Sequence, residues 1–143
     1  MATLKYSRQR ACIKEYLDST YEHPTADTVY MNVRQQYPNI SLGTVYRNLN
    51  LLAEIGEAKK ITTPLGGDRF DGNVHPHYHF CCTSCGCVSD LDIQPMEQIN
   101  EVARQQFNGK IEGHSMMFYG ICNKCLEKTE DGKNIIDNSE MIC

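Results

Sequence analysis

The chain has 143 residues, a formal net charge of −4 and eight cysteines, a length that suits one ordinary domain or two small ones. It contains no apolar run of 18 residues and no apolar segment near its N-terminus, so we expect no membrane span, no signal peptide and a cytoplasmic protein. In a cytosolic chain, so many cysteines indicate metal binding or redox chemistry rather than disulfides.

The charge is distributed unevenly along the chain. Residues 1–65 hold eight Lys and Arg against six Asp and Glu, giving +2, whereas residues 66–143 hold six against twelve, giving −6. A polyanionic partner is therefore expected to meet the first half of the chain.

Three helices are predicted in the first half. Each begins after a Ser or Thr that can accept a hydrogen bond from the first turn, and each carries apolar residues at helical spacing. Gly56 follows the last of them, in the position typical of a helix end. The expected helices cover residues 7–19, 26–36 and 42–55, with Ser7, Thr25 and Ser41 as N-caps.

A two-stranded ribbon is predicted to follow these helices. Residues 58–62 form one strand, 64–67 the turn and 68–71 the returning strand. Three helices followed by such a ribbon are typical of a winged helix-turn-helix, in which the third helix reads DNA.

The second half is predicted to form a separate α/β unit after a linker at residues 72–76. We expect strands at about 77–81, 87–91 and 110–119, with a helix at about 95–107 between the second and the third. Met96, Ile99, Val102, Ala103 and Phe107 are expected to face inward from that helix. The sequence thus indicates an α+β protein with a DNA-binding domain over 1–73, a second domain over 74–126 and a flexible tail over 127–143.

Two Cys-x-x-Cys pairs give the strongest chemical signal. Cys82 and Cys85 form one pair and Cys122 and Cys125 the other, and two such turns complete a tetrahedral shell of four thiolates that suits structural zinc. A zinc-containing dithiol oxidoreductase is the alternative from a different class, but it needs a reactive pair at a helix N-terminus. Of the other cysteines, Cys12, Cys81 and Cys87 are interpreted as structural, and Cys143 has no assigned role.

Histidines alternate just before the first cysteine pair. In a strand, His77 and His79 project from the same face, and two imidazoles on one face can bind a transition metal when carboxylates assist. Asp71, Asp90 and Asp92 are near in sequence, although each taken alone is an ordinary solvated residue.

The polar face of the third helix is a candidate DNA contact. Hydroxyl, guanidinium and amide groups suit contacts to phosphates and base edges, and an ordinary solvated helix face is the competing interpretation. The candidate residues are Ser41, Thr44, Tyr46, Arg47 and Asn48.

Taken together, several segments in order resemble the ferric uptake regulator family, and most of all its peroxide-stress repressor branch. The matching segments begin at residues 23, 41, 68, 77, 82 and 119: HPTADTVY, SLGTVYRNL, DRFD, HYH, CTSCG and YGICNKC. The similarity covers about residues 6–125. It implies a homodimeric, metal-dependent repressor with an N-terminal winged-helix domain and a C-terminal dimerisation domain, which binds double-stranded DNA at a palindromic operator.

The resemblance also implies roles for individual residues. Cys82, Cys85, Cys122 and Cys125 match the structural zinc ligands, and His23, Asp71, His77, His79 and Asp90 match regulatory ligands that take Fe(II) or Mn(II). In the peroxide branch, hydrogen peroxide oxidises the iron-loaded protein at a ligand histidine, here His23 or His77, and repression is lifted.

Three positions bear on the branch of the family. Iron-sensing members tend to carry Glu where this chain has Asp90, and they carry Asp where it has Tyr78, so their additional metal site looks incomplete here. His114 matches one ligand of that additional site and is interpreted as structural. An iron- or zinc-responsive uptake repressor is the alternative within the family.

Overall fold

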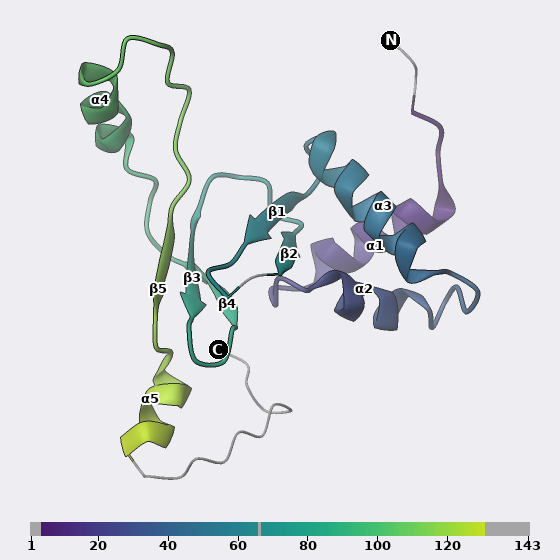
Figure 1. The fold of residues 1–143 in the computed structure, drawn as a ribbon. Helices are drawn as coiled ribbons and strands as arrows, with labels where there is room; N and C mark the ends of the chain where they lie inside the picture. Colours follow the sequence, from purple (N-terminus) through teal and green to yellow (C-terminus); the bar gives the residue numbers. More distant parts are fainter. Residues whose placement is uncertain (1–3, 66, 131–143) are drawn as a thin grey trace. The chain divides into compact units, whose positions relative to one another are not determined.

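The protein divides into two compact units, Met1–Val74 and His75–Cys143, drawn in the computed structural model of Figure 1. The structure describes residues 4–65 and 67–130. Among these residues, no helix is both long and apolar enough to cross a membrane.

The first unit starts with three capped helices, α1 (Arg8–Ser19), α2 (Ala26–Val33) and α3 (Leu42–Glu54). The side chains of Ser7, Thr25 and Ser41 accept hydrogen bonds from backbone N–H groups of the first turns, which confirms the predicted N-caps. Helix α2 ends three residues before the predicted position. Its last residues give way to tight turns before Pro38, because a residue that precedes proline is disfavoured in helical conformation.

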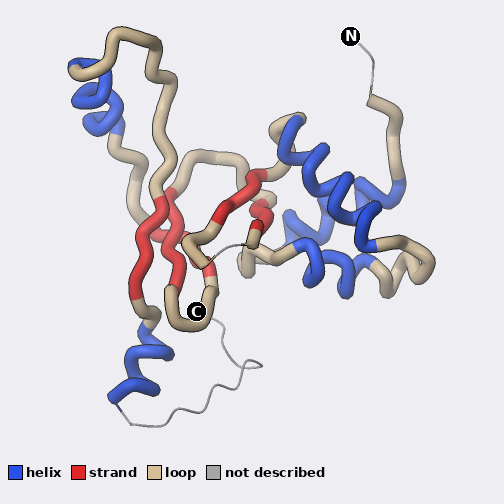
Figure 2. The backbone as a smooth tube through the Cα atoms, viewed as in Figure 1, coloured by secondary structure: helices blue, strands red, loops and turns tan. Residues whose placement is uncertain are grey.

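A hairpin of β1 (Lys59–Thr62) and β2 (Asp68–Asp71) completes the first unit. Its strands are antiparallel, with Lys59 opposite Asp71, and Figure 2 shows them in red after the helices. The core lies among the three helices and the hairpin. Its buried residues are Ile13, Leu17, Ala26, Val29, Val33, Ile40, Val45, Leu49, Leu52, Ala58 and Phe70.

A three-stranded sheet organises the second unit. It consists of β3 (Tyr78–Cys82), β4 (Val88–Leu91) and β5 (Met117–Gly120) in the order β4-β3-β5. Strand β3 is antiparallel to β4 and parallel to β5. The predicted third strand was too long, because residues 111–116 are not in a strand.

Two helices, α4 (Glu97–Gln105) and α5 (Asn123–Glu130), complete the second unit, and Figure 1 shows them beyond opposite ends of the sheet. The inward face predicted for α4 and its flanking residues was wrong for Met96, Val102 and Phe107, which are exposed, whereas Ile99 and Ala103 are half-buried. Asn100 is the buried residue of α4. Helix α5 continues through residues 127–130, at the start of the predicted tail, and the remainder of that tail lies outside the described residues.

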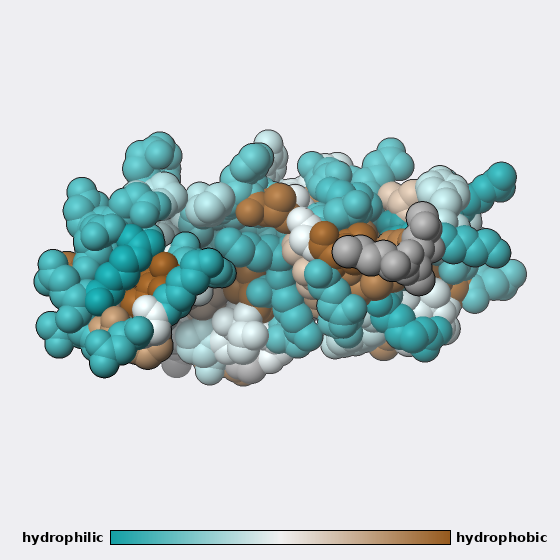
Figure 3. All heavy atoms as spheres, turned by 90° about the horizontal axis from the view of Figure 1, so that it is seen from above, coloured by the Kyte–Doolittle hydropathy of each residue, from teal (hydrophilic) through white to brown (hydrophobic). Residues whose placement is uncertain are grey.

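Several apolar side chains of the second unit are exposed, and Figure 3 shows hydrophobic patches between hydrophilic ones on one face of the molecule. The exposed large residues of this unit are Ile93, Met96, Val102, Phe107, Phe118, Tyr119, Ile121 and Leu126. An apolar set of this size is typical of a surface that pairs with another protein surface.

Candidate metal centres and nucleic-acid interface

The parallel pairing of β3 and β5 brings the two cysteine pairs together. Cys82, the last residue of β3, lies opposite Gly120, the last residue of β5, so both Cys-x-x-Cys segments leave the sheet at the same edge. The backbone N–H of Thr83 donates to the carbonyl of Gly120 at 2.8 Å and ties the first segment to the second. A glycine, Gly86, with φ of +78°, allows the first segment to turn back into β4.

The four thiols form a compact group. The Sγ atoms of Cys82, Cys85, Cys122 and Cys125 all lie within 4.8 Å of one another, and those of Cys85 and Cys122 are 3.9 Å apart. Four sulfur ligands at the usual zinc distance of about 2.3 Å in a tetrahedron lie roughly 3.8 Å apart. The donor set therefore fits a tetrahedral thiolate site for a metal such as zinc.

The thiols of this group differ in acidity. Burial raises the pKa of Cys82, but backbone N–H donors, including those of Cys122 at 3.4 Å and Cys85 at 3.5 Å, outweigh burial and lower it to about 6. Burial and the neighbouring thiols raise the pKa of Cys85 to about 12, and burial is also the main cause of the raised pKa of Cys125. A metal that binds here must displace protons.

The two cysteines that flank the first pair are not part of this group. Cys81 is fully buried, and its thiol lies 3.8 Å from the carbonyl of Cys82. Cys87 packs against the thiol cluster but is not one of its four thiols.

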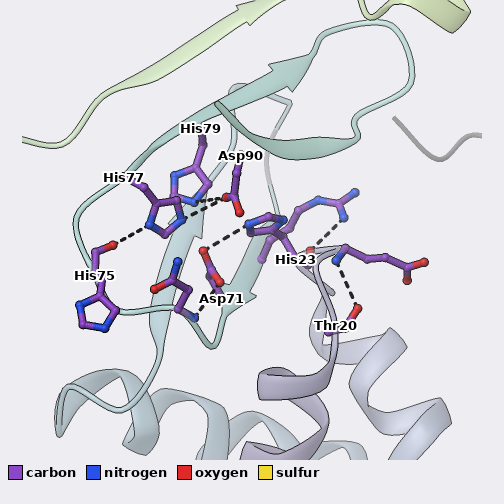
Figure 4. Close-up of polar contacts among 10 residues, drawn as sticks. Thr20, His23, Asp71, His75, His77, His79 and Asp90 are labelled. Atoms are coloured by element: carbon purple, nitrogen blue, oxygen red, sulfur yellow. Dashed lines mark hydrogen bonds and ion pairs between the residues drawn. The ribbon is translucent and has the colours of Figure 1, made fainter. Parts of the chain in front are cut away.

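In the first unit, His23 lies beside Asp71. The loop before α2 pairs with β2: the N–H of Phe70 donates to the carbonyl of Pro24 at 2.9 Å, and the Arg69 guanidinium donates to the carbonyl of His23 at 3.1 Å. These contacts place His23 Nε2 3.2 Å from Asp71 Oδ2, with both side chains buried (Figure 4). Asp71 Oδ1 accepts the backbone N–H of Asn73 at 2.9 Å, so Oδ2 is the oxygen directed at the imidazole.

The backbone of His23 has a φ of +53°, the only positive φ at a non-glycine position among residues 4–65 and 67–130. This left-handed conformation is uncommon for a residue with a side chain, and such strain is concentrated at functional sites. The surrounding contacts to β2 hold His23 in this conformation and direct its ring toward Asp71.

In the second unit, His77, His79 and Asp90 converge on one face of the sheet. His79 lies directly opposite Asp90 across β3 and β4, and His77 is two residues earlier on the same face. Asp90 Oδ1 is 3.1 Å from His77 Nε2 and 3.4 Å from His79 Nε2, as the dashed lines of Figure 4 show. The two rings are 4.3 Å apart between centroids.

The orientation of His77 is fixed by the backbone. Its Nδ1 lies 2.6 Å from the carbonyl of His75, and because a carbonyl only accepts, Nδ1 carries the proton. In the neutral ring, Nε2 then has a lone pair directed at a carboxylate oxygen, an arrangement that a shared cation stabilises. Asp92, the other carboxylate that the sequence suggested, is exposed and belongs to neither cluster.

The candidate DNA-contacting residues lie on the first turns of α3, where they are partly used by the helix itself. Ser41 Oγ caps the N–H of Thr44 at 3.1 Å, and the Arg47 guanidinium donates to Thr44 Oγ1 at 3.0 Å. Asn48 is half-buried and donates to the carbonyl of Thr44, whereas Tyr46 and Arg47 are exposed.

Sequence reasoning missed Lys60 on β1. Its Nζ donates to Asn50 on α3 at 3.2 Å and lies 3.4 Å from Asp68. The hairpin thus places an ammonium group next to the helix that the sequence selects as the DNA reader. The signal was available, because Lys59 and Lys60 open a strand that follows this helix directly.

The architecture and its side-chain clusters define a class: a two-unit α+β protein with a four-thiol cluster that fits a metal ion, and with His and carboxylate donors in each unit. The model of the ferric uptake regulator family matches residues 1–119. The chain belongs to this family, and it is a metal-dependent transcriptional regulator rather than an enzyme.

Its relatives include peroxide-responsive repressors. The chain is 35% identical to the one from Staphylococcus epidermidis over 127 residues, which cover 89% of this chain and 85% of that one. Identity to the one from Staphylococcus aureus is 36%, over 89% and 86% of the two chains.

Solved structures of two proteins from this family have a similar fold. The peroxide stress regulator of Campylobacter jejuni superposes with a TM-score of 0.71 at 32% identity, over 82% of this chain and 88% of that one. The ferric uptake regulator of Helicobacter pylori superposes with a TM-score of 0.74 at 25% identity, over 86% of this chain and 83% of that one.

Proposed function

We propose that this protein is a homodimeric DNA-binding repressor that senses hydrogen peroxide by oxidation of a histidine ligand of its regulatory metal. The observation that carries the proposal is the division of the His and Asp donors between the two units: His23 with Asp71, and His77 and His79 with Asp90. The similarity to peroxide-responsive repressors supports it.

The first unit supplies the DNA-binding domain, residues 1–73. Helices α1 to α3 followed by the β1–β2 hairpin support a winged helix-turn-helix. Helix α3 would enter the major groove with Tyr46 and Arg47 toward the bases, while Ser41, Thr44 and Asn48 hold the first turns and Lys60 reaches a phosphate. A palindromic operator follows from a two-fold symmetric dimer.

The second unit supplies the dimerisation domain, residues 74–126. Val102 of α4, the flanking residues Met96 and Phe107, and Phe118 and Tyr119 of β5 are exposed. A second copy of the chain would cover these side chains, which explains why the amphipathic helix has its apolar face outside the single chain.

The thiol cluster would hold structural Zn(II). Its ligands, Cys82, Cys85, Cys122 and Cys125, occupy all four positions of a tetrahedron and leave none open to a substrate. Such a site acts through folding free energy rather than chemistry.

The five remaining donors would hold the regulatory ion. Three imidazoles and two carboxylates form a nitrogen and oxygen donor set that suits Fe(II) or Mn(II) better than a thiolate set would. Because the donors belong to both units, an ion that takes all five fixes the orientation of the DNA-binding unit on the dimer. The ion then favours DNA binding through its preference for one arrangement.

Fe(II) held by these five side chains would catalyse the reaction, in which hydrogen peroxide is the two-electron oxidant. One peroxide oxygen replaces the hydrogen on a ring carbon of a ligand imidazole as C=O, that hydrogen moves to a ring nitrogen, and the other oxygen leaves as water. His23 and His77 are the ligands that the family resemblance selects for this oxidation. The oxidised ring loses a nitrogen donor, so the ligand set of the unit that carries it is reduced by one. The units are then released from the arrangement that binds DNA, and repression ends.

The deciding experiment compares the two metals. The zinc-loaded protein is charged anaerobically with Fe(II) or Mn(II), exposed to a short pulse of hydrogen peroxide and digested for peptide mass spectrometry. We expect one added oxygen at His23 or His77 with Fe(II) and none with Mn(II), together with loss of operator binding in the iron sample.

Two variants make the test specific. His77→Ala removes a proposed ligand, whereas His75→Ala alters an exposed neighbour but retains the backbone carbonyl that orients His77. The His77→Ala variant should lose Mn(II) binding and the His75→Ala variant should keep it. Unmodified histidines in protein that holds Fe(II) through these ligands would favour the iron-responsive uptake repressor instead.

A further inference from the structure

A buried chain of hydrogen bonds in the second unit is not used by either proposed metal site. The Tyr78 hydroxyl lies 2.7 Å from His114 Nε2, and His114 Nδ1 lies 2.7 Å from Asn100 Oδ1. The Tyr78 hydroxyl also accepts the backbone N–H of Met96 at 2.7 Å, and Asn100 Nδ2 donates to Glu97 at 3.0 Å. Tyr78 and Asn100 are buried, at 3% and 4% exposed, and His114 between them is half-buried.

The directions of these bonds are mutually consistent. Asn100 donates to Glu97 through its nitrogen, so its oxygen accepts from His114 Nδ1–H. In a neutral imidazole, Nε2 is then the acceptor, and Tyr78 donates its proton to it while its oxygen accepts from Met96. Both ring nitrogens of His114 are engaged, so this ring is not free to ligate a metal.

The chain links the strand of the regulatory histidines to helix α4. Tyr78 lies between His77 and His79 on β3, and because side chains alternate along a strand, it projects from the opposite face. Met96 is the N-cap residue of α4, which has no side-chain cap of its own. The Tyr78 hydroxyl therefore acts at the start of α4, and Asn100 anchors the middle of the same helix.

We propose that Tyr78 is a positioning residue that couples metal binding at His77 and His79 to helix α4, the helix whose apolar side chains are exposed for pairing. The inference rests on the proposed function, because it assumes a regulatory ion on those histidines. When an ion orders the histidines of β3, the strand between them is ordered too. Tyr78 transmits that order to the first turn of α4 through Met96 and to its centre through His114 and Asn100.

The experiment measures hydrogen exchange by mass spectrometry in the full zinc-loaded protein, with and without Mn(II), for wild type and Tyr78→Phe. The substitution keeps the ring and removes the hydroxyl. Tyr6→Phe is the matched control, because Tyr6 is an exposed tyrosine outside the proposed metal sites and the proposed pairing surface. In the wild type and the control, we expect Mn(II) to slow exchange in peptides from both β3 and α4.

In Tyr78→Phe, Mn(II) should still protect β3 but should no longer protect residues 97–105. We also expect the Mn(II) affinity of this variant to be about tenfold weaker, a difference that corresponds to about 1.4 kcal/mol. A purely structural tyrosine would speed exchange in α4 equally with and without Mn(II) and leave the difference unchanged. That unchanged difference, or an equal loss in Tyr6→Phe, would overturn the inference.

A second variant covers the case in which Tyr78→Phe does not fold. His114→Ala interrupts the chain from the other side, leaves β3 intact and should give the same loss of protection in α4. Failure of the proposed function has a different signature: wild-type protein in which Mn(II) protects neither β3 nor α4 would overturn both conclusions. Protection of both in every variant would overturn this inference alone.

Discussion

Substitution of Cys82 by serine is expected to unfold the second unit and leave the first intact. The buried apolar residues described in the second unit are Tyr78, Cys81, Cys82, Val88, Cys122 and Cys125. Three of these six are thiols of the metal cluster, so the cluster is itself a large part of this core. The first unit has a separate core of aliphatic and aromatic residues that includes no member of the cluster.

The magnitude follows from what the Cys82 sulfur contacts. Zinc bound by four cysteines contributes on the order of 10 kcal/mol to folding, so one thiolate accounts for roughly 2–3 kcal/mol if the four share equally. Its sulfur also accepts the backbone N–H groups of Cys85 and Cys122, and hydrogen bonds to a charged acceptor contribute about 1.5–3 kcal/mol each. The total, roughly 5–9 kcal/mol, lies within the stability of whole domains, about 5–15 kcal/mol.

The assay is hydrogen exchange of the full protein, with zinc content measured on the same samples. Peptides from β3 and β5 should lose protection in Cys82→Ser, while peptides from α1 and α3 keep it. Cys12→Ser is the control, because Cys12 lies in the first unit and serine retains a donor for Gln36. Zinc-free Cys82→Ser protein with wild-type protection in β3 would refute the argument that the cluster holds this unit together.

Three further predictions concern the thiols, the start of the linker at Gly72 and the proposed DNA interface. Zinc binding should release about one more proton at pH 5 than at pH 7.5. The pKa of the Cys82 thiol is lowered to about 6, so this thiol is already ionised at pH 7.5 but not at pH 5. Calorimetry in buffers of different ionisation enthalpy measures the number of protons released. Gly72→Ala should destabilise the first unit by about 1–3 kcal/mol, since a Cβ would lie 2.8 Å from the Leu17 carbonyl oxygen; chemical denaturation against Gly113→Ala, where a Cβ has open space, provides the comparison. Lys60→Ala should reduce the salt dependence of operator binding by about one counterion without altering base preference, whereas Arg47→Lys should relax the preference at one base pair, at a cost of about 1–3 kcal/mol.

The sequence predicted local features well because they depend on neighbouring residues. The caps at Ser7, Thr25 and Ser41 and the β1–β2 ribbon follow from short-range hydrogen bonding. The apolar stripe of α4 was also detected, but not its exposure, because periodicity does not reveal whether another chain covers a helix face.

Long-range contacts could not be obtained from the pattern. The bond between Tyr78 and His114 joins residues 36 positions apart, and neither residue type signals a partner. The left-handed backbone at His23 likewise depends on contacts with β2, 46 residues later. The prediction that the third strand begins before Met117 was wrong for a related reason. His114 makes side-chain hydrogen bonds with Tyr78 and Asn100, which the local pattern does not reveal.

In the proposed function, the division of donors between the units gives the two metal sites different tasks. All four thiols belong to the second unit, so an ion that binds them changes the stability of that unit and cannot report on the orientation of the first. His23 and Asp71 belong to the first unit, and His77, His79 and Asp90 to the second.

Neither of these half-sites is a strong metal site alone, because two or three donors with one carboxylate leave most of the coordination shell to water. Under the proposed function, an ion gains its full donor set only when both units contribute, so its affinity and the arrangement of the units would be thermodynamically linked. The same linkage would work in reverse: oxidation of one ligand imidazole would weaken binding of the ion and release the arrangement of the units. On this proposal, the loss of a single nitrogen donor lifts repression without unfolding either unit, provided that the thiol cluster remains intact.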